Sequence, residues 1–264
     1  MKTIGAGRSD IGLHRRVNED TFRILQESPE AQRQGACYIV CDGMGGAPAG
    51  DVASRLAAEA FIAAWASDEL VAVDTRQRLQ LVVHEANGAV YHAARSSLDM
   101  AGMGTTLVGL VARAGWIYVC NVGDSRCYRR RGGILRQLTE DHTLAEEMVR
   151  EGLLDAAYAR EVSERNILTR AVGTNPQVEV DITSDEMRPG DRYLLCSDGL
   201  WGVVPDIDLL ATMAETVPQD AAQHLIDAAN RRGGPDNITA LVVDVVESEG
   251  AGAGKGAAET SSTS

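Results

Sequence analysis

Residues 36–46 read ACYIVCDGMGG, an apolar run that passes directly into an aspartate and a glycine-rich segment. The run Ala36–Cys41 has the length and the residue types of a buried β-strand. Residues 192–201, RYLLCSDGLW, repeat the arrangement, with a predicted strand over Arg192–Ser197 that ends at Asp198-Gly199. Both segments therefore predict a core strand that delivers an aspartate to its end.

Further strands and helices are predicted around these two segments. Runs rich in apolar and β-branched residues predict strands over Thr105–Val111, Trp116–Val122, Ser125–Arg130, Ile134–Leu138 and Ile238–Val246. Apolar residues at 3.6-residue spacing predict helices over Pro48–Trp65, Arg76–Leu98, Asp206–Glu215 and Gln219–Arg231. The strands are separated by hairpin-length gaps, and the helices come in pairs. The pattern favours an α+β fold in which helices pack on mostly antiparallel sheets.

The composition indicates a soluble globular protein with an acidic surface. The chain has 264 residues, 44% of them hydrophobic, and its formal net charge is -13. Such a charge repels phosphate backbones and anionic lipids, so we expect neither nucleic acid nor membrane as a partner. The apolar runs Ala60–Ala66 and Ala240–Val246 are far shorter than the ~20 residues that span a bilayer.

The ends of the chain and its cysteines complete this first description. Residues 1–246 are expected to form one domain, and 247–264, rich in Gly, Ala, Ser and Thr, a disordered tail. The first residues lack the long apolar stretch of a signal peptide, so a cytoplasmic location is expected. The cysteines form no CxxC pair and lie in or beside apolar runs, which predicts free thiols. They are Cys37, Cys41, Cys120, Cys127 and Cys196.

Acidic residues recur where the predicted strands begin and end. Asp42 and Asp198 each follow a strand, Asp236 precedes one, Asp124 lies between two, and Asn18-Glu19-Asp20 stands near the start. Aspartates at strand ends can converge on one end of a sheet core, where their oxygens suit hard cations such as Mg²⁺ or Mn²⁺. An Asp-Gly pair after an apolar run is also a common hairpin turn, so each turn alone has a purely structural explanation.

Seven short motifs occur in a fixed order along the chain. They are Arg15-Arg16-Val17-Asn18-Glu19-Asp20, Asp42-Gly43-Met44-Gly45-Gly46, Gly104-Thr105-Thr106, Gly123-Asp124-Ser125-Arg126, Leu138-Thr139-Glu140-Asp141-His142, Ser197-Asp198-Gly199-Leu200 and Gly234-Pro235-Asp236-Asn237-Ile238-Thr239. The series resembles the bacterial branch of the metal-dependent Ser/Thr protein phosphatases of the 2C type, the PPM family. The resemblance extends from about Arg15 to Val246.

This resemblance implies a fold and a metal site. The implied fold is a four-layer α-β-β-α sandwich, with two antiparallel sheets flanked by helical pairs. Asp42 would bridge two tightly bound Mn²⁺ or Mg²⁺ ions, with the Gly43 carbonyl as a further ligand. Asp198 and Asp236 would be the other direct ligands. Asp124, together with Asp198, would hold a third and weaker ion.

The resemblance also implies roles for residues around the metals. Glu19 and Asp20 match acidic residues that hold metal-bound waters, and Arg15 matches the arginine that binds the substrate phosphate. Many eukaryotic relatives carry a histidine, a candidate general acid, where this chain has Met44. A metal-bound water is then the first candidate for that role and His142 the second, with a local turn or cap function as the alternative for His142.

The implied reaction is hydrolysis of phosphoserine and phosphothreonine in proteins by a water that two cations activate, without a covalent intermediate. Phosphorylated proteins would be the partners, including a cognate bacterial Ser/Thr kinase and its substrates. By the same resemblance, Thr143–Pro176 would form a flap beside the active site, whose arginines could meet acidic substrate segments.

Three other functions have less support in the sequence. The glycine-rich segment after Asp42 mimics a dinucleotide-binding turn, but no βαβ unit follows and the carboxylate would repel a pyrophosphate. Residues 120–126 fit the C-x5-R loop of cysteine-dependent phosphatases, but Asp124 would put a negative charge in the cradle. A phosphoprotein-binding module without activity would be expected to lack one of the metal-ligating aspartates. Asp42, Asp198 and Asp236 are all present in this sequence.

Overall fold

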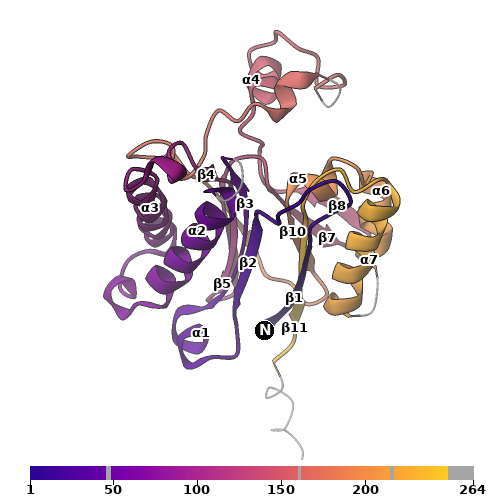
Figure 1. Ribbon diagram of the computed structural model, residues 1–264. Helices are drawn as coiled ribbons and strands as arrows, with labels where there is room; N and C mark the ends of the chain where they lie inside the picture. The colour runs from indigo at the N-terminus through magenta and orange to yellow at the C-terminus, as the bar shows by residue number, and fades with distance from the viewer. Residues whose placement is uncertain (46–48, 160–161, 215–216, 249–264) are drawn as a thin grey trace, which may run out of the picture.

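The computed structural model describes residues 1–45, 49–159, 162–214 and 217–248, and these form two antiparallel sheets packed face to face (Figure 1). One sheet has the order β1-β11-β10-β7-β8 and the other β2-β3-β5-β6-β9, with the short β4 paired to β3. The strands are β1 (Lys2–Asp10), β2 (Asp20–Leu25), β3 (Ala36–Met44), β4 (Gly104–Thr105), β5 (Leu107–Arg113), β6 (Trp116–Val122), β7 (Arg126–Arg131), β8 (Ile134–Gln137), β9 (Asp181–Glu186), β10 (Arg192–Cys196) and β11 (Ile238–Val246).

Helices cover the outer face of each sheet, which confirms the four-layer arrangement (Figure 1). Helices α2 (Ala49–Ala66) and α3 (Thr75–Ala94) pack on the sheet that contains β3. Helices α5 (Asp198–Trp201), α6 (Asp206–Thr212) and α7 (Pro218–Arg231) pack on the sheet that contains β10. Short helices α1 (Pro29–Gln34) and α4 (Leu144–Arg150) and the 3₁₀ turns η1 (Asp68–Leu70), η2 (Leu98–Met100) and η3 (Ser163–Asn166) lie outside this frame.

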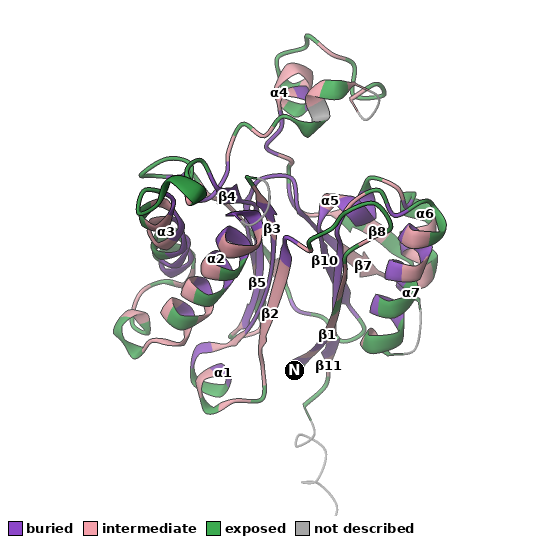
Figure 2. Ribbon diagram, viewed as in Figure 1, coloured by how far each residue is buried: buried purple, intermediate pink, exposed green. Residues whose placement is uncertain are grey.

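Strand β3 shows how the sequence produces these layers. Its side chains alternate between two faces. Cys37, Ile39 and Cys41 pack beneath α2 and α3, whereas Tyr38 and Val40 pack between the sheets. Because both faces are buried, the strand is an unbroken apolar run instead of an alternating one. Figure 2 shows the same pattern for the molecule, with buried strands between helices that are exposed on their outer sides.

The segment that contains α4 and η3 stands away from the sandwich (Figure 1). Its two ends are tied together where Thr143 pairs with Leu168, and the Leu144 amide donates to the Ile167 carbonyl at 2.9 Å. The predicted flap, Thr143–Pro176, is too long: Val172 is buried and pairs with Thr105 of β4, so the last part of this range belongs to the body. We call residues 143–168 the flap from here on.

Several predicted boundaries shift. Strand β3 continues past Cys41 to Met44, so Asp42-Gly43 is strand and not turn, and the strand predicted over Thr105–Val111 breaks at Thr106. Helix α3 ends at Ala94 instead of Leu98. The predicted helix ends Pro48 and Glu215 lie outside the described residues, as does the predicted tail after Ser248. No helix in the described residues could span a membrane.

Candidate metal centre

A cavity of about 700 Å³ lies where β3 ends and α5 begins. Seven of the eight predicted site residues line it, although they come from five separate parts of the sequence. They are Arg15, Glu19, Asp42, Gly43, Asp124, Asp198 and Asp236. Asp20 does not line the cavity. The sandwich therefore brings together the acidic groups that the sequence motifs keep far apart.

The backbone of Asp42 is fixed by the neighbouring threonines. Its amide donates to the Thr106 hydroxyl at 2.9 Å. Its carbonyl accepts from the Thr106 amide at 2.9 Å and from the Thr105 hydroxyl at 2.8 Å. Across the other edge of β3, Asp42 stands opposite Asp20 of β2. Asp42 is thus held on a rigid strand instead of a mobile turn.

Two glycines allow the cavity walls to approach each other. A side chain on Gly43 would collide with the carbonyl oxygen of Gly50 at the start of α2, and one on Gly199 would collide with the carbonyl oxygen of Asn237. Gly199 follows Asp198, and Asn237 follows Asp236. The absence of a Cβ at Gly199 therefore lets the two aspartate-bearing segments touch.

Asp20 lies behind the cavity wall, nearly buried, and accepts a hydrogen bond from the Ser197 hydroxyl at 2.6 Å. Ser197 in turn accepts from the Thr239 amide at 3.0 Å. Burial raises the pKa of Asp20 to about 7, although the Ser197 hydrogen bond opposes the shift. Asp20 therefore contacts the segments next to Asp198 and Asp236 but is not itself part of the cavity lining.

The electrostatics of the cavity suit a divalent cation. Burial, followed by the charges of neighbouring aspartates, raises the pKa of Asp42 and of Asp124 well above the usual range. One carboxylate oxygen of Glu19 and one of Asp20 are buried without a hydrogen-bond partner. Buried carboxylates in this state gain from a cation that neutralises and ligates them.

In the part of the chain that the structure describes, no three His, Cys, Asp or Glu side chains form a ready-made group that could hold a metal ion. Two of the acidic groups have other partners, since Asp236 contacts Arg15 and Asp20 accepts a hydrogen bond from Ser197. Mg²⁺ keeps several waters and binds through one or two carboxylates, so an open, acidic cavity is compatible with it. The donor set fits Mg²⁺ or Mn²⁺ better than a softer metal.

Arg15 projects from a loop that is fastened by one side chain. Its guanidinium is half-exposed and forms an ion pair with Asp236 at 2.6 Å, not with the adjacent Glu19 or Asp20. The buried Asn237 amide donates to the carbonyls of Ile11 at 2.9 Å and Val17 at 3.0 Å, and its oxygen accepts from the Glu19 amide at 2.8 Å. The loop that presents Arg15 is thereby closed at both ends.

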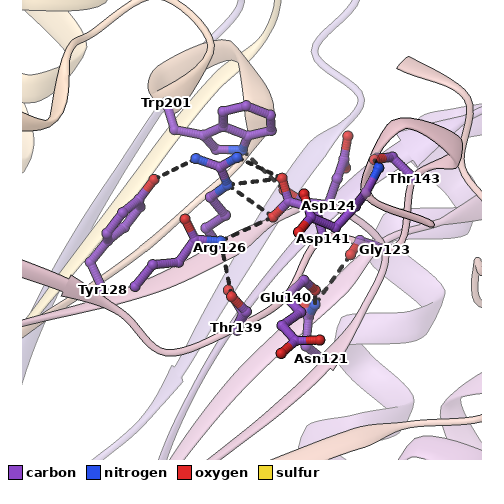
Figure 3. Close-up of polar contacts among 12 residues, drawn as sticks. Asn121, Gly123, Asp124, Arg126, Tyr128, Thr139, Glu140, Asp141, Thr143 and Trp201 are labelled. Atoms are coloured by element: carbon purple, nitrogen blue, oxygen red, sulfur yellow. Dashed lines mark hydrogen bonds and ion pairs between the residues drawn. The ribbon is translucent and has the colours of Figure 1, made fainter. Parts of the chain in front are cut away.

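Asp124 lies in the turn between β6 and β7, beside a buried network (Figure 3). Its possible partner Arg126 is paired instead with Asp141, through contacts of 2.6 to 3.1 Å. The Asp124 carbonyl accepts from the Trp201 indole nitrogen at 3.0 Å. Asp124 thus lines the cavity, whereas Arg126 forms an ion pair with Asp141 instead of with Asp124.

These observations decide against the cysteine-dependent mechanism. Burial raises the pKa of the Cys120 thiol to about 12, so it is not a thiolate near neutral pH. The thiol points to the Gly109 carbonyl inside the sheet. All five cysteines are free and buried, as predicted.

Comparison with known proteins identifies the family. The family model described as Protein phosphatase 2C matches residues 14–232. The chain belongs to the protein phosphatase 2C family. The serine/threonine phosphatase stp of Listeria innocua is 38% identical over 240 residues, which cover 90% of this chain and 94% of that protein.

Solved structures of the 2C family share the fold. The crystal structure of the Mycobacterium tuberculosis serine/threonine phosphatase PstP has a TM-score of 0.83 and 35% identity, covering 94% of this chain and 100% of that one. The catalytic domain of PstP in complex with two manganese ions has a TM-score of 0.80 and 36% identity, covering 93% of this chain and 99% of that one.

Met44 and His142, the two residues that bear on the identity of the general acid, lie differently with respect to the cavity. Met44, in place of the histidine of many relatives, lines the cavity. The ring of His142 is buried outside the cavity lining, where Nδ1 accepts from the Gly123 amide at 3.1 Å and Nε2 lies 3.2 Å from Asp181. Both ring nitrogens of His142 have local partners, which favours the local structural role given above as the alternative.

Sequence reasoning gave no role to several residues that shape the site. They are Thr106, Ser197, Trp201 and Asn237. Three belong to the motifs quoted above, and Trp201 directly follows one of them. Their positions in or next to these motifs could have indicated a role in the site. The fold is needed to show which backbone groups they contact by hydrogen bonds.

Proposed function

We propose that this chain, a metal-dependent protein serine/threonine phosphatase, works through two cations held by Asp42, Asp198 and Asp236. The convergence of these three aspartates on one cavity carries the proposal. Burial, and after it the charges of the acidic groups around Asp42, raise its pKa, and a cation that neutralises the ionised carboxylate would remove this cost. The two manganese ions in the related PstP structure support the number two.

The contacts of the proposed ligands support a separate role for each. Asp42, fixed by Thr105 and Thr106, would hold both cations, and the Gly43 carbonyl would be a further ligand. Glu19 and Asp20 bind waters of the cations, Glu19 from the cavity wall and Asp20 from behind it. When bound, Mn²⁺ or Mg²⁺ supplies Lewis-acid activation of water and of the phosphoryl group.

Arg15 binds the substrate phosphate. Its guanidinium can offer two parallel donors to two phosphate oxygens. In the structure one of its nitrogens is on Asp236, and the side chain is 48% exposed at the cavity rim. Exchange of this carboxylate for a phosphate would release Asp236 toward a cation. Substrate binding and completion of the metal site are therefore coupled through one ion pair.

A third, weaker cation is shared by Asp124 and Asp198. Both line the cavity, and the charge of Asp198 is the second cause, after burial, of the raised pKa of Asp124. The substrates are phosphorylated proteins, including a cognate Ser/Thr kinase and its targets. The catalytic domain is 1–246, and the buried free cysteines are compatible with a reducing, cytoplasmic location.

The test is metal reconstitution. Protein stripped with EDTA is assayed on a phosphothreonine peptide with added Mn²⁺ or Mg²⁺, beside Asp42→Asn and Cys120→Ala. We expect activity to need the added metal, to be lost in Asp42→Asn and to persist in Cys120→Ala. Activity in EDTA that Cys120→Ala removes would overturn the mechanism. Binding of the phosphopeptide by the metal-loaded wild type without turnover would instead support an inactive binding module.

A further inference from the structure

The side chain of Trp201 connects two of the acidic segments. Trp201 ends the four-residue helix α5, whose first residue is Asp198. Its indole nitrogen donates to the backbone carbonyl of Asp124 at 3.0 Å, a bond between residues 77 positions apart. The ring itself is 7% exposed and lines the cavity. One side chain thus ties the helix that carries Asp198 to the turn that carries Asp124.

The indole ring is held in one orientation by Arg126. The guanidinium carbon of Arg126 lies 3.4 Å from the centre of the Trp201 ring (Figure 3). Arg126 is itself fixed, because it binds both oxygens of Asp141 and donates to the Tyr128 hydroxyl at 2.8 Å. A stacked, doubly anchored guanidinium leaves the indole little freedom to turn. The N–H of Trp201 is therefore aimed at Asp124 by a rigid support.

The hydrogen bond from Trp201 to the Asp124 carbonyl influences where the Asp124 side chain points. A hydrogen bond to the Asp124 carbonyl fixes the peptide plane that follows Asp124, and with it the backbone angle that sets where the Cβ points. The turn is fastened on its other side by His142, which contacts both backbone groups of Gly123. His142 belongs to the segment that enters the flap, whereas Trp201 reaches the turn from the side of Asp198.

We propose that Trp201 is a positioning residue that sets the separation of Asp124 and Asp198, and so the affinity of the weaker cation. The proposal rests on the third-cation assignment made above. It differs from a simple packing role, because packing depends on the ring whereas positioning depends on the N–H group. Trp201→Phe separates the two, since phenylalanine keeps an aromatic ring beneath Arg126 and lacks the donor.

The chain offers a matched control. Trp116 begins β6, is 46% exposed and does not line the cavity. Trp116→Phe makes the same chemical change away from the site. Calorimetric titration of Mn²⁺ into metal-stripped wild type, Trp201→Phe, Trp116→Phe and Asp124→Ala reports binding without any assay of activity. Unfolding midpoints confirm that each variant is folded at the temperature of titration.

We expect Asp124→Ala to lose the weakest binding event and Trp201→Phe to keep it with a dissociation constant raised roughly three- to tenfold, the range of one hydrogen bond. The tight events should not change, and Trp116→Phe should match wild type. The Mn²⁺ concentration for half-maximal activity of Trp201→Phe should rise, with the wild-type kcat restored at saturating Mn²⁺.

A Trp201→Phe isotherm identical to wild type, with the weakest event absent from Asp124→Ala, would overturn the positioning role and leave the third cation standing. Equal weakening of all events in Trp201→Phe would also overturn it, in favour of general damage to the fold. If Asp124→Ala retains every event, the third-cation assignment and the inference fail together, while the two tight cations remain.

Discussion

Asp20 and Asp42 stand directly opposite each other on the adjacent strands β2 and β3. Asp20 is buried and Asp42 is half-buried at the cavity wall, and the charge of Asp20 is the second cause, after burial, of the raised pKa of Asp42. The pair stores electrostatic repulsion whenever both carboxyl groups are ionised. The folded protein therefore depends on either protons or cations to neutralise this part of its core.

This relationship predicts how the metal-free protein responds to pH. The pKa of Asp20 is about 7 in the fold, against ~4 in an unfolded chain, so between these values the native state binds protons that the unfolded state has released. Stability must then fall as the pH rises through that window. We expect the unfolding midpoint in EDTA to be roughly 3–8 °C lower at pH about 7.5 than at pH about 5.5.

Two comparisons check this assignment. Asp20→Asn should flatten the pH dependence in EDTA, because asparagine does not titrate. Saturating Mg²⁺ should raise the midpoint more at the higher pH, where the ligands are ionised. A metal-free protein that is more stable at the higher pH would contradict the assigned direction.

Replacement of Arg15 should impair substrate binding more than the fold. Because Arg15 is half-exposed and binds the phosphate in our proposal, Arg15→Ala should lower kcat/KM on a phosphopeptide by roughly 10- to 100-fold, mainly through KM. The control is Arg16→Ala, since Arg16 is exposed and does not line the cavity. Steady-state kinetics that leave the two variants alike would refute the phosphate-binding role.

The two ring nitrogens of His142 can be tested separately. Because Nδ1 accepts a hydrogen bond from the Gly123 amide, the ring must carry its proton on Nε2, next to Asp181. His142→Asn places an oxygen near the Nδ1 position, whereas His142→Gln reaches toward the Nε2 position. Loss of the buried Gly123 bond should cost about 1–3 kcal/mol in the glutamine variant.

We therefore expect the asparagine variant to be the more stable and the more active of the two, as measured by urea unfolding and by kcat. The reverse order would show that the contact with Asp181, not the one with Gly123, is what His142 provides.

A stability gain is predicted at Ala114. Ala114 and Gly115 form the two-residue loop between β5 and β6, and both have positive φ, 51° and 83°. This is the geometry of a type I′ turn, which favours Asn-Gly over Ala-Gly. Ala114→Asn should raise the free energy of unfolding by about 0.5–1 kcal/mol, and Ala114→Val, which is β-branched, should lower it. Urea unfolding that ranks valine above asparagine would contradict the turn assignment.

The sequence predicts the central strands well and the outer ones poorly. Strands β3, β10 and β11 are buried on both faces and read as unbroken apolar runs. The missed strands, β1, β2 and β9, all lie at sheet edges, where one side of the backbone lacks a partner strand and polar side chains are tolerated. Strand β9, for example, reads DITSDE, and its Asp185 pairs with two arginines of β7, Arg129 and Arg131.

For the site, aspartates beside glycines or at strand ends predict the four aspartates that line the cavity, because these signals are local. The partners of those residues are not local. Arg15 was considered beside Glu19 or Asp20, its neighbours in sequence, yet it pairs with Asp236, 221 positions away. Such pairs form only because the fold places strands from opposite ends of the chain, β1 and β11, side by side.

The pairing of β1 with β11 has a consequence for how the protein is made. The first strand lies at a sheet edge and pairs along all nine residues with the last one, Ile238–Val246. A ribosome releases β1 long before its partner has been synthesised, so β1 must wait unpaired until Ile238–Val246 has emerged. Asp236 emerges just ahead of that partner. We expect nascent chains to remain inactive until residues 238–246 have emerged and paired with β1.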